Sequence, residues 1–259
     1  MANATVALDH NQSNYLCNVL RLGSGSRVLA FNGLDGEWRT RLERSGKRAA
    51  TLIAEDLVRP QPPVRDVTLF FAPLKHARLD YLVQKAVEMG VTRLAPVLTA
   101  RTQVQRVNLE RMRANAIEAA EQCGILSIPE IREPSRFDAA LATLSKSELL
   151  IFCDEDAEIA NPFDVLRKAP AASTIALMIG PEGGFDPAER ARIISAPGVA
   201  RISLGPRILR ADTAAVAALA IAQAALGEWR GFETRGLEAT VVEKISKACP
   251  NHDLAILSE

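Results

Sequence analysis

The sequence lacks the features that identify membrane and secreted proteins. It has no run of about 20 apolar residues of the kind that spans a bilayer. Residues 1–10 have neither the basic start nor the apolar centre of a secretory signal. We therefore expect a cytoplasmic protein that does not associate with membranes.

Cysteine is also scarce, and the four cysteines, Cys17, Cys123, Cys153 and Cys249, are widely separated. Metal sites generally use closely spaced pairs of ligands, and none is present here. We predict reduced thiols and no metal site. The chain also lacks the lysine-containing phosphate loop and the dinucleotide fingerprint, which argues against a generic nucleotide-binding enzyme.

Net charge is absent as well, with 31 basic and 31 acidic residues. A neutral chain argues against a nucleic-acid partner unless the charge is concentrated locally. Residues 1–65 carry nine basic and six acidic groups, a net charge of +3, and five of the basic groups lie within residues 39–48. This cluster is compatible with an RNA-binding surface, and equally with the solvated face of a hairpin.

The first part of the chain has the pattern of a small β domain. Short strands are predicted at residues 27–31, 37–42 and 49–54, and the loop between the first two is rich in Asn, Asp and Gly. Prolines at 60, 62 and 63 then interrupt the pattern and predict a domain boundary. We place the first domain at residues 1–65.

Strands and helices alternate after this boundary. Apolar runs predict buried strands at residues 67–72, 93–98, 149–153, 175–179 and 200–204. Helical spacing is found around residues 79–87, 109–122 and 213–226, and Asp186 and Pro187 are typical of a helix start. This order predicts an α/β domain with a parallel sheet over residues 66–232. Residues 233–259 form a tail without an assigned structure.

Two loops in this domain have the character of a binding site. Residues 177–185 leave a buried strand, turn through three glycines and a proline, and enter a helix. Residues 203–214 also follow a strand and turn at Gly205-Pro206 before a helix. Ligands of open α/β sheets bind just beyond the carboxyl ends of strands, where both loops are expected. Glu182 in the first loop disfavours an anionic ligand, although either loop taken alone could be an ordinary tight turn.

These segments resemble the 16S ribosomal RNA uridine-N3 methyltransferases. Residues 177–185 are similar to the IGPEGG loop of that family, and residues 203–214 to its LGxRILRxETA segment. Residues 73–75, 84–91 and 118–122 match further motifs, and residues 18–25 resemble the start of a PUA-like barrel. The similarity extends from about His10 to Trp229 in the correct order.

The resemblance implies a knotted α/β methyltransferase domain preceded by a PUA-like β-barrel, an S-adenosylmethionine cofactor, a homodimer, and ribosomal RNA or the small ribosomal subunit as partner. The cofactor-binding residues that it implies are Gly180, Glu182, Gly183, Leu204, Gly205, Ile208 and Leu209. Three departures stand out. Asp212 replaces a family glutamate, Ile125 replaces a frequent arginine, and the segment after Trp229 matches nothing in the family.

Uridine N3 carries a weakly acidic proton, so its methylation requires help with proton removal. We predict Arg210 and Asp212 as catalytic residues, with Arg210 stabilising negative charge on the uracil oxygens and Asp212 a candidate base. Arg210 could equally anchor a phosphate or a carboxylate. The position of Asp212 before a helix favours a simple N-cap, and Glu182 could merely fix its own loop.

Arg21, Arg39, Arg41 and Arg44 of the first domain are predicted to bind RNA phosphates. Two alternatives to uridine-N3 methylation remain open. One is a knotted methyltransferase acting on another RNA atom, such as a ribose 2′-hydroxyl. The other is a non-catalytic RNA-binding or ribosome-assembly factor, which the substitutions at Asp212 and Ile125 keep open.

Overall fold

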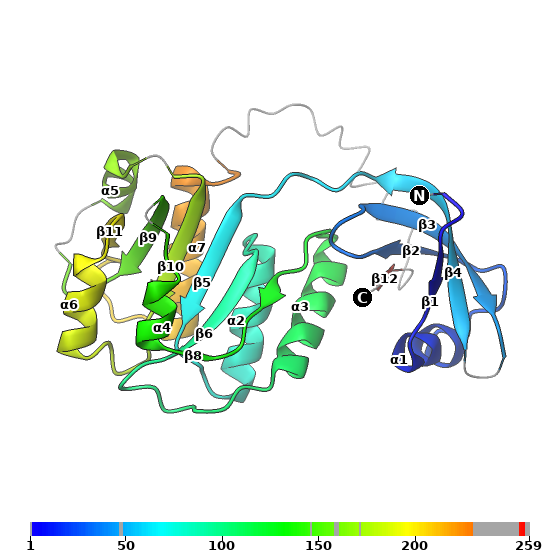
Figure 1. Cartoon of the computed structure of the whole chain (residues 1–259), viewed down its shortest axis with the longest axis horizontal. Coiled ribbons are helices and arrows are strands. Elements are labelled where there is room, and N and C mark those ends of the chain that lie inside the picture. The colour runs from blue at the N-terminus through cyan, green and yellow to red at the C-terminus, as the bar shows by residue number, and fades with distance from the viewer. Residues whose placement is uncertain are drawn as a thin grey trace. The chain divides into compact units, whose positions relative to one another are not determined.

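The computed structural model describes residues 2–46, 49–145, 147–157, 161–170 and 172–229, and the backbone of Leu254–Ile256. The chain divides into two compact units between Pro63 and Val64, at the end of the proline-rich segment. Each unit contains its own sheet (Figure 1). Most of the tail, residues 233–259, lies outside the described residues.

The first unit is built on a five-stranded sheet with the order β1-β4-β3-β2-β12. Neighbouring strands are antiparallel, except that β12 is parallel to β2. The elements are β1 (Thr5–Ala7), α1 (His10–Asn14), the π-helical turn η1 (Tyr15–Val19), β2 (Arg27–Phe31), β3 (Glu37–Arg44), β4 (Ala50–Arg59) and β12 (Leu254–Ile256).

Alternation along β3 separates an apolar and a charged face of this sheet. Thr40 and Leu42 are buried, whereas Arg39 is exposed and Arg41 is partly exposed. Successive side chains of a strand point to opposite faces, so the arginines lie on the face away from the core. Leu16 of η1 is buried and belongs to the same apolar core as Leu42.

The second unit contains a seven-stranded sheet in which all the pairs are parallel. The order is β11-β9-β10-β5-β6-β7, and β8 also pairs with β6. Its strands are β5 (Asp66–Phe71), β6 (Arg93–Leu98), β7 (Glu130–Ile131), β8 (Ser135–Arg136), β9 (Glu148–Cys153), β10 (Thr174–Ile179) and β11 (Val199–Ile202). Its helices are α2 (His76–Glu88), α3 (Leu109–Cys123), α4 (Phe137–Ala142), α5 (Pro162–Lys168), α6 (Pro187–Ser195) and α7 (Ala211–Leu226).

Helices cover both faces of this sheet (Figure 1). On one face, Phe137 of α4 and Ile193 of α6 share a buried cluster with Phe70, Phe152 and Met178 of the strands. On the other face α2 packs against α3 and α7, and α7 also contacts α5 and β10. Double coverage explains why the central strands are continuously apolar rather than alternating.

The connection from β11 to α7 determines the topology of the site. β11 lies at the edge of the sheet, beyond β9. The helix that follows it nevertheless packs on β10 and α2 in the middle of the unit. The chain therefore returns past β9 after leaving the edge. The predicted trefoil knot requires a return of this kind.

Several predicted elements differ from the observed ones in their boundaries, three of them as follows. β4 extends to Arg59 rather than residue 54, β11 ends at Ile202 rather than residue 204, and α7 begins at Ala211 rather than residue 213. The short helices α1, α4 and α5 and the turn η1 are not predicted by the sequence pattern. Each of them is seven residues or fewer, which is too short for a clear helical period.

Candidate active site

The carboxyl ends of five parallel strands meet at one edge of the second sheet. The loops that leave this edge follow β5, β6, β9, β10 and β11. The predicted ligand segments, residues 177–185 and 203–214, cover most of the loop 180–186 after β10 and all of the loop 203–210 after β11, and both loops therefore lie at the same edge. Only β9 separates their strands, so the strand ends are about 10 Å apart.

The loop after β10 also lies where the direction of chain winding changes. β10 is followed by α6, which covers one face of the sheet. Its neighbours β9 and β5 are followed by α5 and α2, which belong to the layer on the other face. Chains that diverge to opposite faces leave a crevice between them, and this is where open α/β sheets bind their ligands.

Contacts from two neighbouring segments, the loop after β6 and helix α2, hold the loop after β10 and the helix that follows it. Arg101, in the loop after β6, donates to the carbonyl oxygen of Gly183 at 2.7 Å. Arg78 of α2 is 3.5 Å from a carboxylate oxygen of Glu182. The amide of Ala100 donates to Glu189 at 2.8 Å. Glu189 also completes a capping box with Asp186 at the start of α6, so one side chain links the β6 loop to the helix that follows the ligand loop.

The glycines of the two loops have different structural roles. A Cβ on Gly180 would lie 2.8 Å from the Phe185 ring, so the packing of its own loop requires glycine there. Gly205 has a φ of +100°, and no heavy atom lies within 4 Å of a Cβ placed on it. Its backbone conformation thus favours glycine, and the space beside it is open. Gly205 therefore has the room that a ligand needs to approach the main chain.

The remaining predicted ligand residues of the second loop are unequally covered. Leu204 and Leu209 are partly buried, whereas Ile208 is 98% exposed. Arg207 and Arg210 are exposed, and neither side chain forms an ion pair or hydrogen bond within the described part of the chain. The loop thus presents apolar and cationic groups at the sheet edge.

The structure corrects the interpretation of Asp212 as an N-cap. The N-cap of α7 is Arg210, whose backbone is extended (φ −67°, ψ 152°) and whose side chain makes no capping bond. Asp212 lies in the first turn of the helix, where its carboxylate accepts a hydrogen bond from the amide of Thr213 at 3.0 Å. The helix begins two residues earlier than predicted, so the N-cap also lies two residues earlier. An acidic residue in the first turn still interacts favourably with the helix dipole.

Asp154, which no sequence motif singles out, is the most buried carboxylate near the site. It follows β9 directly, and its side chain is 1% exposed. It accepts hydrogen bonds from Arg190 of α6 and Arg201 of β11. Burial would raise the pKa of Asp154, but the bonds from these arginines outweigh it and the pKa is lowered. The one sequence feature that could have pointed to Asp154 is its position directly after an apolar strand.

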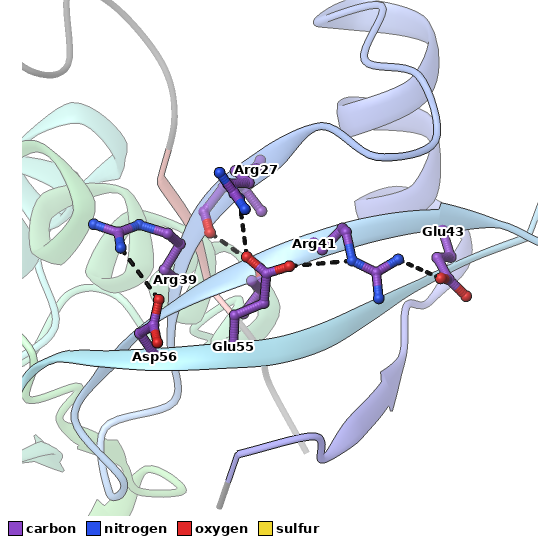
Figure 2. A network of polar contacts seen from close by, with 8 residues as sticks. Arg27, Arg39, Arg41, Glu43, Glu55 and Asp56 are labelled. Carbon is purple, nitrogen blue, oxygen red and sulfur yellow. Dashed lines mark hydrogen bonds and ion pairs between the residues drawn. The ribbon is translucent and has the colours of Figure 1, made fainter.

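The four predicted RNA-binding arginines of the first unit differ in their surroundings, because two of them form ion pairs and two do not. Arg39 pairs with Asp56 at 3.3 Å. Arg41 pairs with Glu55 at 3.1 Å and also with Glu43 (Figure 2). A register shift between β3 and β4 leaves Glu55 without a Cα partner and places it beside these arginines.

Arg21 and Arg44 are the other two predicted RNA-binding arginines. Both are exposed, and neither side chain forms an ion pair within the part of the chain that is described. Arg21 also has a φ of +57°, which is uncommon for a residue with a side chain. Sequence alone could not distinguish these two arginines from Arg39 and Arg41, because most of the neutralising carboxylates come from a neighbouring strand.

Cys17, Cys123 and Cys153 are free thiols, and Cys249 lies outside the described residues. In the part of the chain that the structure describes, no group of three His, Cys, Asp or Glu side chains is arranged to hold a metal ion. None of the described helices is long and apolar enough to cross a membrane.

Family models match both units. A model described as an RNA methyltransferase domain matches residues 60–223, and one described as an RNA methyltransferase PUA domain matches residues 8–55. The parallel sheet with ligand loops at its carboxyl edge, preceded by a small β unit, therefore defines an RNA methyltransferase with a PUA-like domain.

Individual relatives narrow the assignment. Ribosomal RNA small subunit methyltransferase E of Rickettsia conorii is 31% identical over 83% of this chain and 87% of its own. The protein of the same name from Synechocystis is 33% identical over 84% of this chain and 72% of its own. The crystal structure of the Neisseria gonorrhoeae enzyme of this name, bound to S-adenosylmethionine, superposes with a TM-score of 0.74 at 29% identity over 86% of this chain and 92% of that one. The chain belongs to the ribosomal RNA small subunit methyltransferase E family, as its motifs indicated.

Proposed function

We propose that this protein transfers a methyl group from S-adenosylmethionine to N3 of a uridine in 16S ribosomal RNA. The observation that carries the proposal is the convergence of residues 180–186 and 203–210 at one sheet edge, in a chain of this family. The Neisseria relative binds S-adenosylmethionine. The choice of N3 as the methylated atom rests on the resemblance of the two loops to those of the uridine-N3 methyltransferases.

The residues present fit such a cofactor. Leu204, Ile208 and Leu209 offer apolar surface suited to an adenine ring, and Gly205 leaves the main chain accessible for polar contacts. Gly180, Glu182 and Gly183 complete the proposed cofactor-binding residues. A carboxylate in the loop suits a positively charged sulfonium or ammonium group better than a phosphate. When bound, S-adenosylmethionine supplies an electrophilic methyl group.

Arg210 is the proposed stabiliser of the deprotonated uracil. Its side chain is exposed at the site edge and has no partner among the described residues, so it is available to a substrate. A guanidinium beside a uracil oxygen would stabilise the negative charge that develops when the N3 proton leaves. Asp212, in the first turn of α7, is the nearby carboxylate that we propose as the proton acceptor.

The reaction is tested by incubating the protein with small subunits from cells that lack it and identifying the methylated nucleoside by mass spectrometry. N3-methyluridine is expected. A 2′-O-methylated product would instead support the alternative site of methylation. Absence of any product, combined with S-adenosylmethionine binding in calorimetry, would favour the assembly factor.

Replacement of Arg210 by alanine tests its role. We expect kcat to fall about 10²- to 10³-fold, as on removal of one oxyanion donor, with little change in the dissociation constant of S-adenosylmethionine. Arg207→Ala is the matched control, because Arg207 is an exposed arginine in the same loop. Loss of cofactor binding in Arg210→Ala would make Arg210 a structural or cofactor-binding residue instead.

We also propose that the protein acts in the cytoplasm as a homodimer. The resemblance of the two loops to the methyltransferase family carries this proposal, and Ile208, whose side chain is 98% exposed, is a candidate contact for the partner subunit. Light scattering at micromolar concentration distinguishes a dimer from a monomer.

A further inference from the structure

Asp154 lies between the two ligand loops. It is the first residue after β9, and β9 separates β10 from β11 in the sheet. The amide of Asp154 donates to the carbonyl oxygen of Ile202 at 3.1 Å, so its backbone continues the pairing of β9 with β11. The side chain is 1% exposed.

Two arginines surround the carboxylate. Arg190 donates Nε to Oδ1 at 2.9 Å and Nη2 to Oδ2 at 3.0 Å, which is a bidentate pair. Arg201 approaches Oδ2 with Nε at 2.9 Å and Nη2 at 2.7 Å. The amide of Asp156 donates to Oδ1 at 3.2 Å. Both oxygens of the buried carboxylate are therefore hydrogen-bonded from several directions.

The two arginines belong to the segments that border the ligand loops. Arg190 is in α6, which begins immediately after residues 180–186. Arg201 is in β11, which ends immediately before residues 203–210. A movement of either loop that displaced α6 or β11 would therefore have to break a bond to the same carboxylate.

We propose that Asp154 is a positioning residue that holds the two cofactor loops at a fixed separation. It reaches the cofactor only through Arg190 and Arg201. This inference rests on the proposed binding of S-adenosylmethionine to these loops. It predicts that the charge on Asp154, as well as its size, determines cofactor affinity.

Asp154→Asn is the main test, because it keeps the size of the side chain and removes its charge. We expect the dissociation constant of S-adenosylmethionine, measured by calorimetry, and its KM to rise at least tenfold, with a smaller change in kcat. In the protein without cofactor, amide hydrogen exchange should increase in residues 180–186 and 203–210 together and stay unchanged in β6 and α3.

Asp138→Asn is the matched control. Asp138 forms an ion pair with Arg192, which is on the same helix as Arg190, but the pair is exposed and joins α6 to α4. We expect cofactor affinity within twofold of the wild type. Equal effects in the two variants would overturn the proposal, as would a folded Asp154→Asn protein with unchanged affinity and exchange.

A second variant decides the case in which Asp154→Asn does not fold. Arg201→Lys keeps the charge but loses the planar fork, and we expect cofactor affinity about threefold to tenfold weaker. Unchanged affinity would overturn the proposal. If the wild-type protein itself fails to bind S-adenosylmethionine, the proposed function fails, and the hydrogen exchange of the two loops still decides the role of Asp154.

Discussion

Two of the clusters of arginines and carboxylates in this protein differ mainly in the burial of their central carboxylate. On the outer face of β3 and β4, Glu55 contacts Arg27 and Arg41, and its side chain is 23% exposed (Figure 2). At the end of β9, Asp154 contacts Arg190 and Arg201 and is 1% exposed. The carboxylate is therefore reached by water in one cluster and shielded from it in the other, whereas the arginines of both clusters keep contact with solvent.

This difference in burial determines how much each cluster contributes to the free energy of folding. Exposed ion pairs typically stabilise a fold by about 0 to 1 kcal/mol, because water and salt screen them. Removing one partner of a buried pair is far more damaging, since the remaining charge is left without compensation. We therefore expect the first cluster to adjust a surface and the second to determine the geometry of a site.

The largest expected effect is on stability. Asp154→Ala should lower the free energy of unfolding by about 2 to 3 kcal/mol, because it removes the buried partner of two arginines that stay about a third exposed to water. Glu55→Gln should lower it by no more than about 1 kcal/mol. Urea unfolding of both variants at neutral pH provides the measurement. Similar decreases in the two variants would show that burial does not separate the clusters.

The next effect is a dependence on pH. The pKa of Asp154 is lowered in the folded protein, so its ionised form stabilises the fold fully above the unfolded pKa of about 3.9. This stability is lost as the pH falls through the folded pKa. The difference in unfolding free energy between wild type and Asp154→Asn should thus be constant from about pH 7 to 5 and shrink below about pH 4. Asp80, whose pKa is also lowered, is present in both proteins and cancels. A difference that grows in acid would contradict the assignment.

The smallest effect concerns RNA. Joint replacement of Arg21 and Arg44 by alanine should reduce the slope of log affinity against log salt by roughly 0.7 to 0.9 for each RNA phosphate that these arginines neutralise. Joint replacement of Arg39 and Arg41 should change it less, because their carboxylate partners already neutralise them. Filter binding of a ribosomal RNA fragment at several salt concentrations gives both slopes. The reverse order would assign the RNA contacts to the paired arginines.

The sequence predicted the second sheet well because its strands are buried on both faces. Continuous apolar runs such as residues 175–179 define a central strand, and the glycine-containing loops follow from where those runs end. Strand order cannot be read from such runs, since all of them are equally apolar. The proximity of the two loops therefore became evident only from the pairing of β9 with β10 and β11.

The polar framework of the site was beyond the reach of sequence patterns. Asp154, Arg190 and Arg201 are distant in the chain, and nothing local marks them as partners. The same holds for Arg101 and Gly183, which come from different loops. The start of α7 was misplaced for another reason. Asp212 is of a residue type that favours the N-cap position, but the helix begins one residue before it, at Ala211.

The short segment between Arg190 of α6 and Arg201 of β11 limits where residues can be inserted into this protein. Because Arg190 and Arg201 are tied to one carboxylate, residues 191–200 act as a spacer of fixed length between two anchors. An added residue there would force one arginine away from the carboxylate. Grafts and tags are better accommodated beside Thr143 after α4, which is exposed and whose amide and hydroxyl, within the described part of the chain, bond only to the carbonyl oxygen of Ala140.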